Sequence, residues 1–249
     1  MKIATFLYIL FFFILLNSCT QENSNCFSDT CDNGGLCING DCFCPEGFLG
    51  ENCEIFDASK IQLLLDQGRT PKEILDNGIP IDSFYGKSYQ QGLIFYLTPD
   101  GTGMVASETT ISYGAEFGCH GINISGIPDV QDCIDDCSYP EPEDIVIGAR
   151  IGDGKTNTDA ILAECDEQNT AARLCRNLGE DWFLPSRGEL YAMLINLHLN
   201  GHGNFSINFS HWSSTEQIPN QSWVVSFNFG SNNSLSKFNE LRVRAAKEF

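Results

Sequence analysis

Basic side chains are scarce in this sequence, which has 14 Lys and Arg against 33 Asp and Glu and a formal net charge of -19. Electrostatic binding of nucleic acid requires Lys and Arg that displace counterions from phosphates, and an anionic membrane surface makes the same demand. The charge balance therefore argues against both kinds of partner. It favours a self-repelling surface on a protein that works outside the cell.

Long hydrophobic stretches are also few. The apolar run at residues 3–16 is too short to span a bilayer comfortably, but it fits the hydrophobic region of a signal peptide. The run ends in the letters LNSC at 16–19, which resembles a bacterial lipobox. The resemblance implies a signal peptide at 1–18, a lipidated Cys19 and a tether at 19–25. The protein would then be lipid-anchored in a bacterial cell envelope, at the outer membrane or cell surface. The alternative is ordinary secretion, with Cys19 removed or paired.

Cysteine, by contrast, is abundant, and six of the 12 lie between Cys26 and Cys53 at the spacing C-x4-C-x5-C-x4-C-x-C-x8-C. A segment this small cannot bury a core, so disulfides must stabilise it. Six cysteines allow fifteen pairings, and the spacing alone does not choose among them.

The spacing and the turn glycines at 33–35 and 47–50 resemble the EGF-like domain. The resemblance covers residues 26–54 and implies a small two-stranded hairpin. It also implies three disulfides, which are Cys26–Cys37, Cys31–Cys42 and Cys44–Cys53. Residues 21–25 lack the paired acids of calcium-binding members, so we expect no bound calcium. We interpret the module as a spacer.

Residues 55–84 lack cysteine and predict two short helices, the second with a capping box at Thr70 and Glu73. Because their apolar faces need a partner, we expect this helical connector to pack on the following domain. From residue 92 the pattern changes to a strand hairpin, then helices, then strands, with a second capping box at Ser186 and Glu189. This order predicts an α+β fold with an antiparallel sheet and flanking helices.

Residues 85–249 resemble the DUF1566 family, which is also named for the C-terminal domain of the Legionella collagen-like protein. The most specific matching segments read WFLPSRGEL at 182–190, WSSTE at 212–216 and RVRA at 242–245. The resemblance implies a C-type-lectin-like fold on a bacterial surface protein, and in the named member it implies adhesion to polyanionic glycans. This sequence departs from the family at Phe117, where Trp is expected, and in an acidic insertion at about 127–150. An acidic insertion fits poorly with a polyanion, so that ligand class is not carried over.

Five cysteines remain after Cys19 and the first six are set aside, so at least one thiol is unpaired. We expect a Cys165–Cys175 bridge, because these residues lie at the ends of two short predicted helices. Cys119 is then left with Cys133 or Cys137 as its partner, and a Cys133–Cys137 pair is the competing arrangement.

No residue pattern indicates catalysis, a metal site or a cofactor. His198 and His202 have helical spacing but flank a predicted helix end, which favours loop or surface positions. Five residues are candidates for ligand binding, with burial in the core as the competing interpretation: Trp182, Arg187, Trp212, Glu216 and Trp223.

These observations predict a non-enzymatic surface lipoprotein that displays a lectin-like head and binds an extracellular glycan or protein. One alternative is an enzyme that modifies or degrades extracellular glycans, which would require a pocket of clustered acids. A further alternative is a structural component of a surface assembly.

Overall fold

The computed structural model describes residues 31–130, 147–228, 230 and 232–249. The chain divides into two compact units, Met1–Ile55 and Phe56–Phe249. Several features expected from the sequence lie outside the described residues, namely the signal peptide at 1–18, Cys19, the tether at 19–25, Cys26, Cys133 and Cys137.

The first unit is a small disulfide-linked module with little buried apolar surface. Strand β1 (Leu36–Ile38) pairs antiparallel with β2 (Asp41–Phe43), and β3 (Phe48–Leu49) forms a second two-stranded sheet with β4 (Ile55–Phe56). Its disulfides include Cys31–Cys42 and Cys44–Cys53, the same two pairs that the EGF-like resemblance implies, and Cys37 is also disulfide-bonded. Large apolar side chains such as Leu36 and Phe43 are exposed. Covalent links therefore stabilise this module where a core is lacking.

The described residues of the second unit form two five-stranded sheets and five α-helices, so the α+β class is confirmed. Its strands are β5 (Ser88–Tyr89), β6 (Gly92–Leu97), β7 (Gly103–Ser107), β8 (Ser112–Ala115), β9 (Trp182–Phe183), β10 (Ser210–Ile218), β11 (Gln221–Ser226), β12 (Asn232–Ser236), β13 (Leu241–Val243) and β14 (Ala246–Glu248). Its helices are α1 (Ile61–Asp66), α2 (Pro71–Leu75), α3 (Asp153–Glu164), α4 (Ala171–Arg176) and α5 (Arg187–Asn196).

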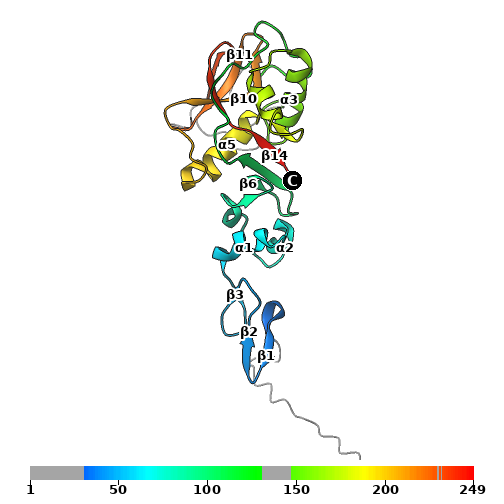
Figure 1. Cartoon of the computed structure of the whole chain (residues 1–249), viewed down its shortest axis with the longest axis vertical. Coiled ribbons are helices and arrows are strands. Elements are labelled where there is room, and N and C mark those ends of the chain that lie inside the picture. The colour runs from blue at the N-terminus through cyan, green and yellow to red at the C-terminus, as the bar shows by residue number, and fades with distance from the viewer. Residues whose placement is uncertain (1–30, 131–146, 229, 231) are drawn as a thin grey trace, which may run out of the picture. The chain divides into compact units, whose positions relative to one another are not determined.

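The end of the chain joins both sheets. One sheet has the order β5-β6-β7-β14-β9, and the other has the order β12-β11-β10-β13-β8. Strand β14 pairs antiparallel with β7 and β9, so the red C-terminal strand lies beside the green strands from the start of the unit (Figure 1). Strand β13, just before it, runs parallel to β10 and antiparallel to β8. Strand β8 is thus the edge strand beside β13.

The first of these sheets has apolar side chains on both faces. In β6, Ile94 belongs to one core cluster and Phe95 to another, because successive side chains of a strand point to opposite faces. Helix α5 covers the Phe95 face through Leu190 and Leu194. The Ile94 face receives the connector helices α1 and α2, whose apolar residues are Ile61, Leu64, Leu65 and Ile74. The expected packing of the connector on the following domain is found.

Local sequence signals place several helix ends correctly. Both predicted capping boxes form, at Thr70 with Glu73 and at Ser186 with Glu189. Thr158 lies inside α3. Its hydroxyl donates to the carbonyl of Gly154 at 2.8 Å and accepts from the Leu184 N–H at 2.9 Å, so it links α3 to the strand that precedes α5.

Candidate functional site

The five residues proposed from the sequence as ligand contacts are all buried. Trp182 and Trp223 are the most exposed of them, at 5%, and the others are Arg187, Trp212 and Glu216. The indole N–H of Trp212 donates to the carbonyl of Ala115 at 2.8 Å, and that of Trp223 donates to Val130 at 2.7 Å. The Arg187 guanidinium carbon lies 4.7 Å from the Trp223 ring centroid. These contacts correct the expectation of a ligand-binding surface at these positions, because the residues hold the core together.

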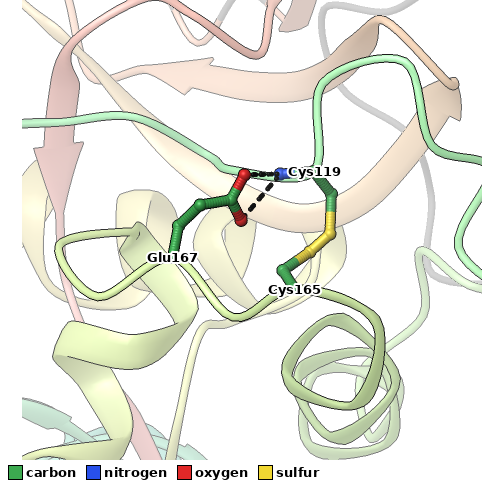
Figure 2. A group of neighbouring side chains, drawn as sticks. All are labelled: Cys119, Cys165 and Glu167. Carbon is green, nitrogen blue, oxygen red and sulfur yellow. Dashed lines mark hydrogen bonds between the residues drawn. A yellow bond between two sulfur atoms is a disulfide. The ribbon is translucent and has the colours of Figure 1, made fainter.

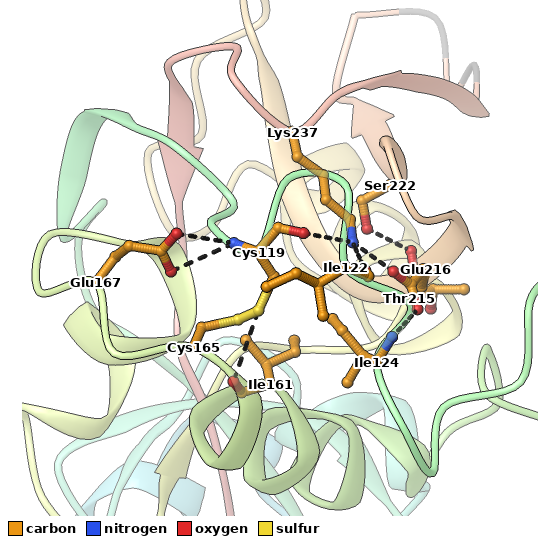
Figure 3. Close-up of polar contacts among 10 residues, drawn as sticks. All are labelled: Cys119, Ile122, Ile124, Ile161, Cys165, Glu167, Thr215, Glu216, Ser222 and Lys237. Carbon is orange, nitrogen blue, oxygen red and sulfur yellow. Dashed lines mark hydrogen bonds and ion pairs between the residues drawn. A yellow bond between two sulfur atoms is a disulfide. The ribbon is translucent and has the colours of Figure 1, made fainter.

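Glu216 forms a fully buried ion pair with Lys237 (Figure 3). The ammonium group of Lys237 also donates to the carbonyls of Cys119 at 3.5 Å and Ile122 at 3.4 Å. Glu216 accepts from the backbone N–H of Ile124 at 3.1 Å. Burial lowers the pKa of Lys237, while its bond to Glu216 favours the charged form. The pair therefore links the loop that follows β8 to strand β10, and its role is structural.

The cysteine pairing in the second unit differs from the expected one. Cys165 forms a disulfide with Cys119, and Cys175 is a buried free thiol whose pKa is raised by burial. Cys165 ends α3, and the loop carrying Cys119 passes beside that helix end, whereas Cys175 points into the core from α4. The predicted Cys165–Cys175 bridge is therefore wrong.

Glu167 lies close to this disulfide, and its carboxylate accepts from the Cys119 N–H at 3.3 and 3.4 Å (Figure 2). One ligand-type atom from each of Cys119, Cys165 and Glu167 lies within 4.8 Å of the others. Cysteine binds metal as a thiolate. With both sulfur atoms joined to each other, this group is better explained as a cross-link than as a metal site.

A shallow acidic pocket of about 280 Å³ opens beside the same disulfide, at the edge strand β8. Three carboxylates line it, from Glu116, Glu167 and Glu240, together with Asn169 and Thr170. A negatively charged ligand is therefore disfavoured in this pocket.

The same edge of the sheet carries an exposed cluster of a different chemistry, formed by Tyr113, Phe209 and Arg242. The Arg242 guanidinium carbon lies 5.1 Å from the ring centroid of Tyr113 and 4.3 Å from that of Phe209. Tyr113 is 71% exposed and Phe209 is 55% exposed. Within the described part of the chain, Arg242 forms no hydrogen bond or ion pair, and its Nε is buried without a partner. We call these three residues the Arg242 cluster.

Strand pairing explains why these distant residues meet. Tyr113 is on β8, which pairs with β13, the strand of Arg242. On the other side of β13, Arg242 is in register with His211 of β10. Phe209 lies immediately before β10 and two residues before His211, which places its ring against Arg242. The sequence gives a partial signal, since Arg242 alternates with the apolar Leu241 and Val243, but the two aromatic residues carry no local pattern.

Comparison with known proteins gives a distant structural likeness. No family model and no curated protein matches the chain. The chain is similar to the crystal structure of a fimbrial protein from Bacteroides ovatus ATCC 8483, with 15% sequence identity and a TM-score of 0.38. The match covers 59% of this chain and spans about a third of the fimbrial protein, 36% of its length. Among the described residues, no helix is long and apolar enough to cross a membrane.

Proposed function

We propose that this protein is a lipid-anchored surface protein of a bacterial cell envelope whose C-terminal unit binds an extracellular glycan through the Arg242 cluster. The observation that carries the proposal is the pair of exposed aromatic rings on a guanidinium that forms no hydrogen bond with any other described residue. Exposed aromatic faces stack on the apolar faces of sugar rings, and an uncommitted guanidinium offers donors to their oxygens.

Other parts of the proposal rest on the sequence. The letters LNSC at 16–19 support an acylated Cys19, and the two matching disulfides support an EGF-like spacer. Two sheets with flanking helices are compatible with a C-type-lectin-like head. Mass spectrometry of the mature protein tests the anchor, because an acylated Cys19 adds the mass of its acyl chains and an unmodified one adds none.

We propose binding without catalysis. Glu189 is the residue that most resembles a catalytic acid, since burial raises its pKa to about 7. Its carboxylate, however, is fully buried and accepts hydrogen bonds from three backbone N–H groups, those of Gly152, Gly154 and Ser186. This group therefore has no oxygen free for a substrate, and its contacts explain it as a link between helices.

The full-length protein on a glycan array tests the proposal. We expect saturable binding to a subset of glycans, and a reduction of about tenfold in the affinity for those glycans in Tyr113→Ala or Phe209→Ala, which corresponds to about 1.4 kcal/mol of lost stacking. Phe238→Ala is the matched control, because Phe238 is 62% exposed but its ring stacks on His120 instead of on Arg242. Equal binding by all three variants would contradict the proposal, and so would release of a cleaved product.

A further inference from the structure

Arg242 carries a positive charge that no carboxylate of the described chain neutralises. It forms none of the four ion pairs found among the described residues, although the sequence has 33 acidic side chains. Its side chain is only half-buried, and its contacts are the two flanking rings. Other arginines, such as Arg69 and Arg244, also form none of these ion pairs. Among the described cation–ring contacts, however, only those of Arg242 involve exposed aromatic rings.

The residues behind Arg242 share this shortage of acceptors. Arg244 lies two positions further along the chain and is fully buried. Its Nη2 donates to the carbonyls of Glu108 and Gly203, each at 2.8 Å, while its Nε and Nη1 have no partner. His211, in register with Arg242, is also fully buried, and neither ring nitrogen has a partner. Burial, followed by the charges of Arg244 and Arg242, lowers the pKa of His211 to about 3, so the ring is neutral at physiological pH.

Buried nitrogen atoms without a hydrogen-bond partner among the described residues thus gather at one place in the fold. They are Nε of Arg242, Nε and Nη1 of Arg244 and the two ring nitrogens of His211. The arginine nitrogens are donors, and the neutral His211 ring adds one further N–H donor. A buried donor without an acceptor costs free energy, and the cost is larger for a charged group. The arrangement is donor-rich and positive, and Arg242 is the one of the three residues that is partly exposed.

We infer that the glycan bound by the Arg242 cluster carries a single carboxylate, as in a terminal acidic sugar, and that Arg242 binds this carboxylate while Tyr113 and Phe209 contact the sugar ring. The inference rests on the proposed function. A guanidinium presents paired N–H donors that match the two oxygens of a carboxylate. One charge is favoured over many, because a net charge of -19 and the acidic pocket on the same strand repel a long polyanion.

The test uses the full-length protein and matched glycan pairs, each a free acid and its methyl ester. Each glycan of the panel has glucuronic, galacturonic or sialic acid as its terminal sugar, and the affinities are measured by titration calorimetry. For at least one pair we expect the free acid to bind about ten- to a hundredfold more tightly than the ester, the range for a charge-assisted hydrogen bond. Arg242→Gln should abolish that preference, and Arg242→Lys should restore part of it, because a lysine keeps the charge without the paired donors. Arg69→Gln is the control, because it removes the same charge at an exposed position outside the cluster. This variant should keep the preference for the free acid.

The outcomes separate the two proposals. Equal affinity for acid and ester in the unmodified protein would overturn the inference and leave the glycan-binding function standing. Tighter binding of heparin, a polyanion, than of any single-acid glycan would also overturn it. Failure of every acid, ester and neutral glycan to bind would overturn the inference together with the proposed function.

Discussion

Glu189 of helix α5 accepts a hydrogen bond of 2.8 Å from the backbone N–H of Gly152, the residue that precedes helix α3. The same carboxylate accepts from Gly154 at 3.3 Å and from Ser186 at 2.7 Å. One side chain therefore satisfies N–H groups at the beginnings of two helices, which have no partners within their own helices. The negative charge also lies at the positive end of both helix dipoles.

The raised pKa of Glu189 predicts how stability depends on pH. Burial raises the pKa from 4.5 to about 7 although the three N–H donors oppose this. Since the folded carboxyl holds its proton more tightly than the unfolded one, its contribution is complete below about pH 4.5 and is lost as pH rises through about 7. The loss is on the order of 3 kcal/mol. Glu189→Gln does not titrate and should lack this loss.

Urea unfolding of both proteins at about pH 5 and about pH 8 measures the effect. The free energy of unfolding should fall more for the unmodified protein than for Glu189→Gln between these conditions. An equal fall in the two proteins would contradict the assignment.

The close approach of Gly154 to this carboxylate gives a second prediction. A Cβ atom at Gly154 would press against the Glu189 carboxylate and lie 2.8 Å from the backbone nitrogen of Ser186. Gly154→Ala should therefore lower the free energy of unfolding by about 1–3 kcal/mol, the cost of overpacking a core. In Gly114→Ala the new Cβ would meet only Glu240, at ordinary contact distance. This control should change stability much less, and equal losses in the two variants would count against the packing argument.

The buried pair Glu216–Lys237 should behave as one unit. Lys237→Met leaves the Glu216 carboxylate buried without its cation, and the expected loss of stability is about 3–5 kcal/mol. Glu216→Gln leaves the lysine without its anion. The double variant should lose about 1–3 kcal/mol less than the two single losses together, because it has no unpaired charge. Urea unfolding of the three variants gives the coupling, and simple additivity would show that the groups do not interact.

The Cys119–Cys165 disulfide links residues 46 apart in sequence. Its removal by Cys119→Ala should cost about 4 kcal/mol, since a loop of this length gains much freedom in the unfolded chain. Cys175→Ala removes only a buried thiol and should cost roughly 1 kcal/mol. Peptide mapping without reduction should recover a fragment linking Cys119 to Cys165, with Cys175 alkylated only after unfolding. A Cys165–Cys175 fragment would contradict this pairing.

The correct and incorrect sequence predictions differ in the range of the interactions involved. The capping boxes at Ser186 and Thr70 depend on a residue three positions away, so the letters predict them. The packing of the connector helices on the following domain could also be predicted, since their apolar faces require a partner of any kind. The partner of Cys165 could not be derived in this way. Cys175 is ten residues away in the sequence, whereas Cys119 comes close to Cys165 only when the chain folds. A tryptophan side chain can pack in a core or stack on a sugar ring, and only its burial in the folded chain distinguishes the two roles.

The sequence by itself determined the acidity of the protein, the disulfide-rich character of its first unit, the α+β class and the local ends of its helices. These properties follow from composition and from residues within one turn or one strand of each other. Only the tertiary structure decided which aromatic residues face solvent and which arginine lies against them. Tyr113, Phe209 and Arg242 come from three separate segments, and their meeting depends on the pairing of β8 with β13 and of β13 with β10. Pairing of that kind is set by the packing of the whole unit, because every strand must bury its apolar face at once.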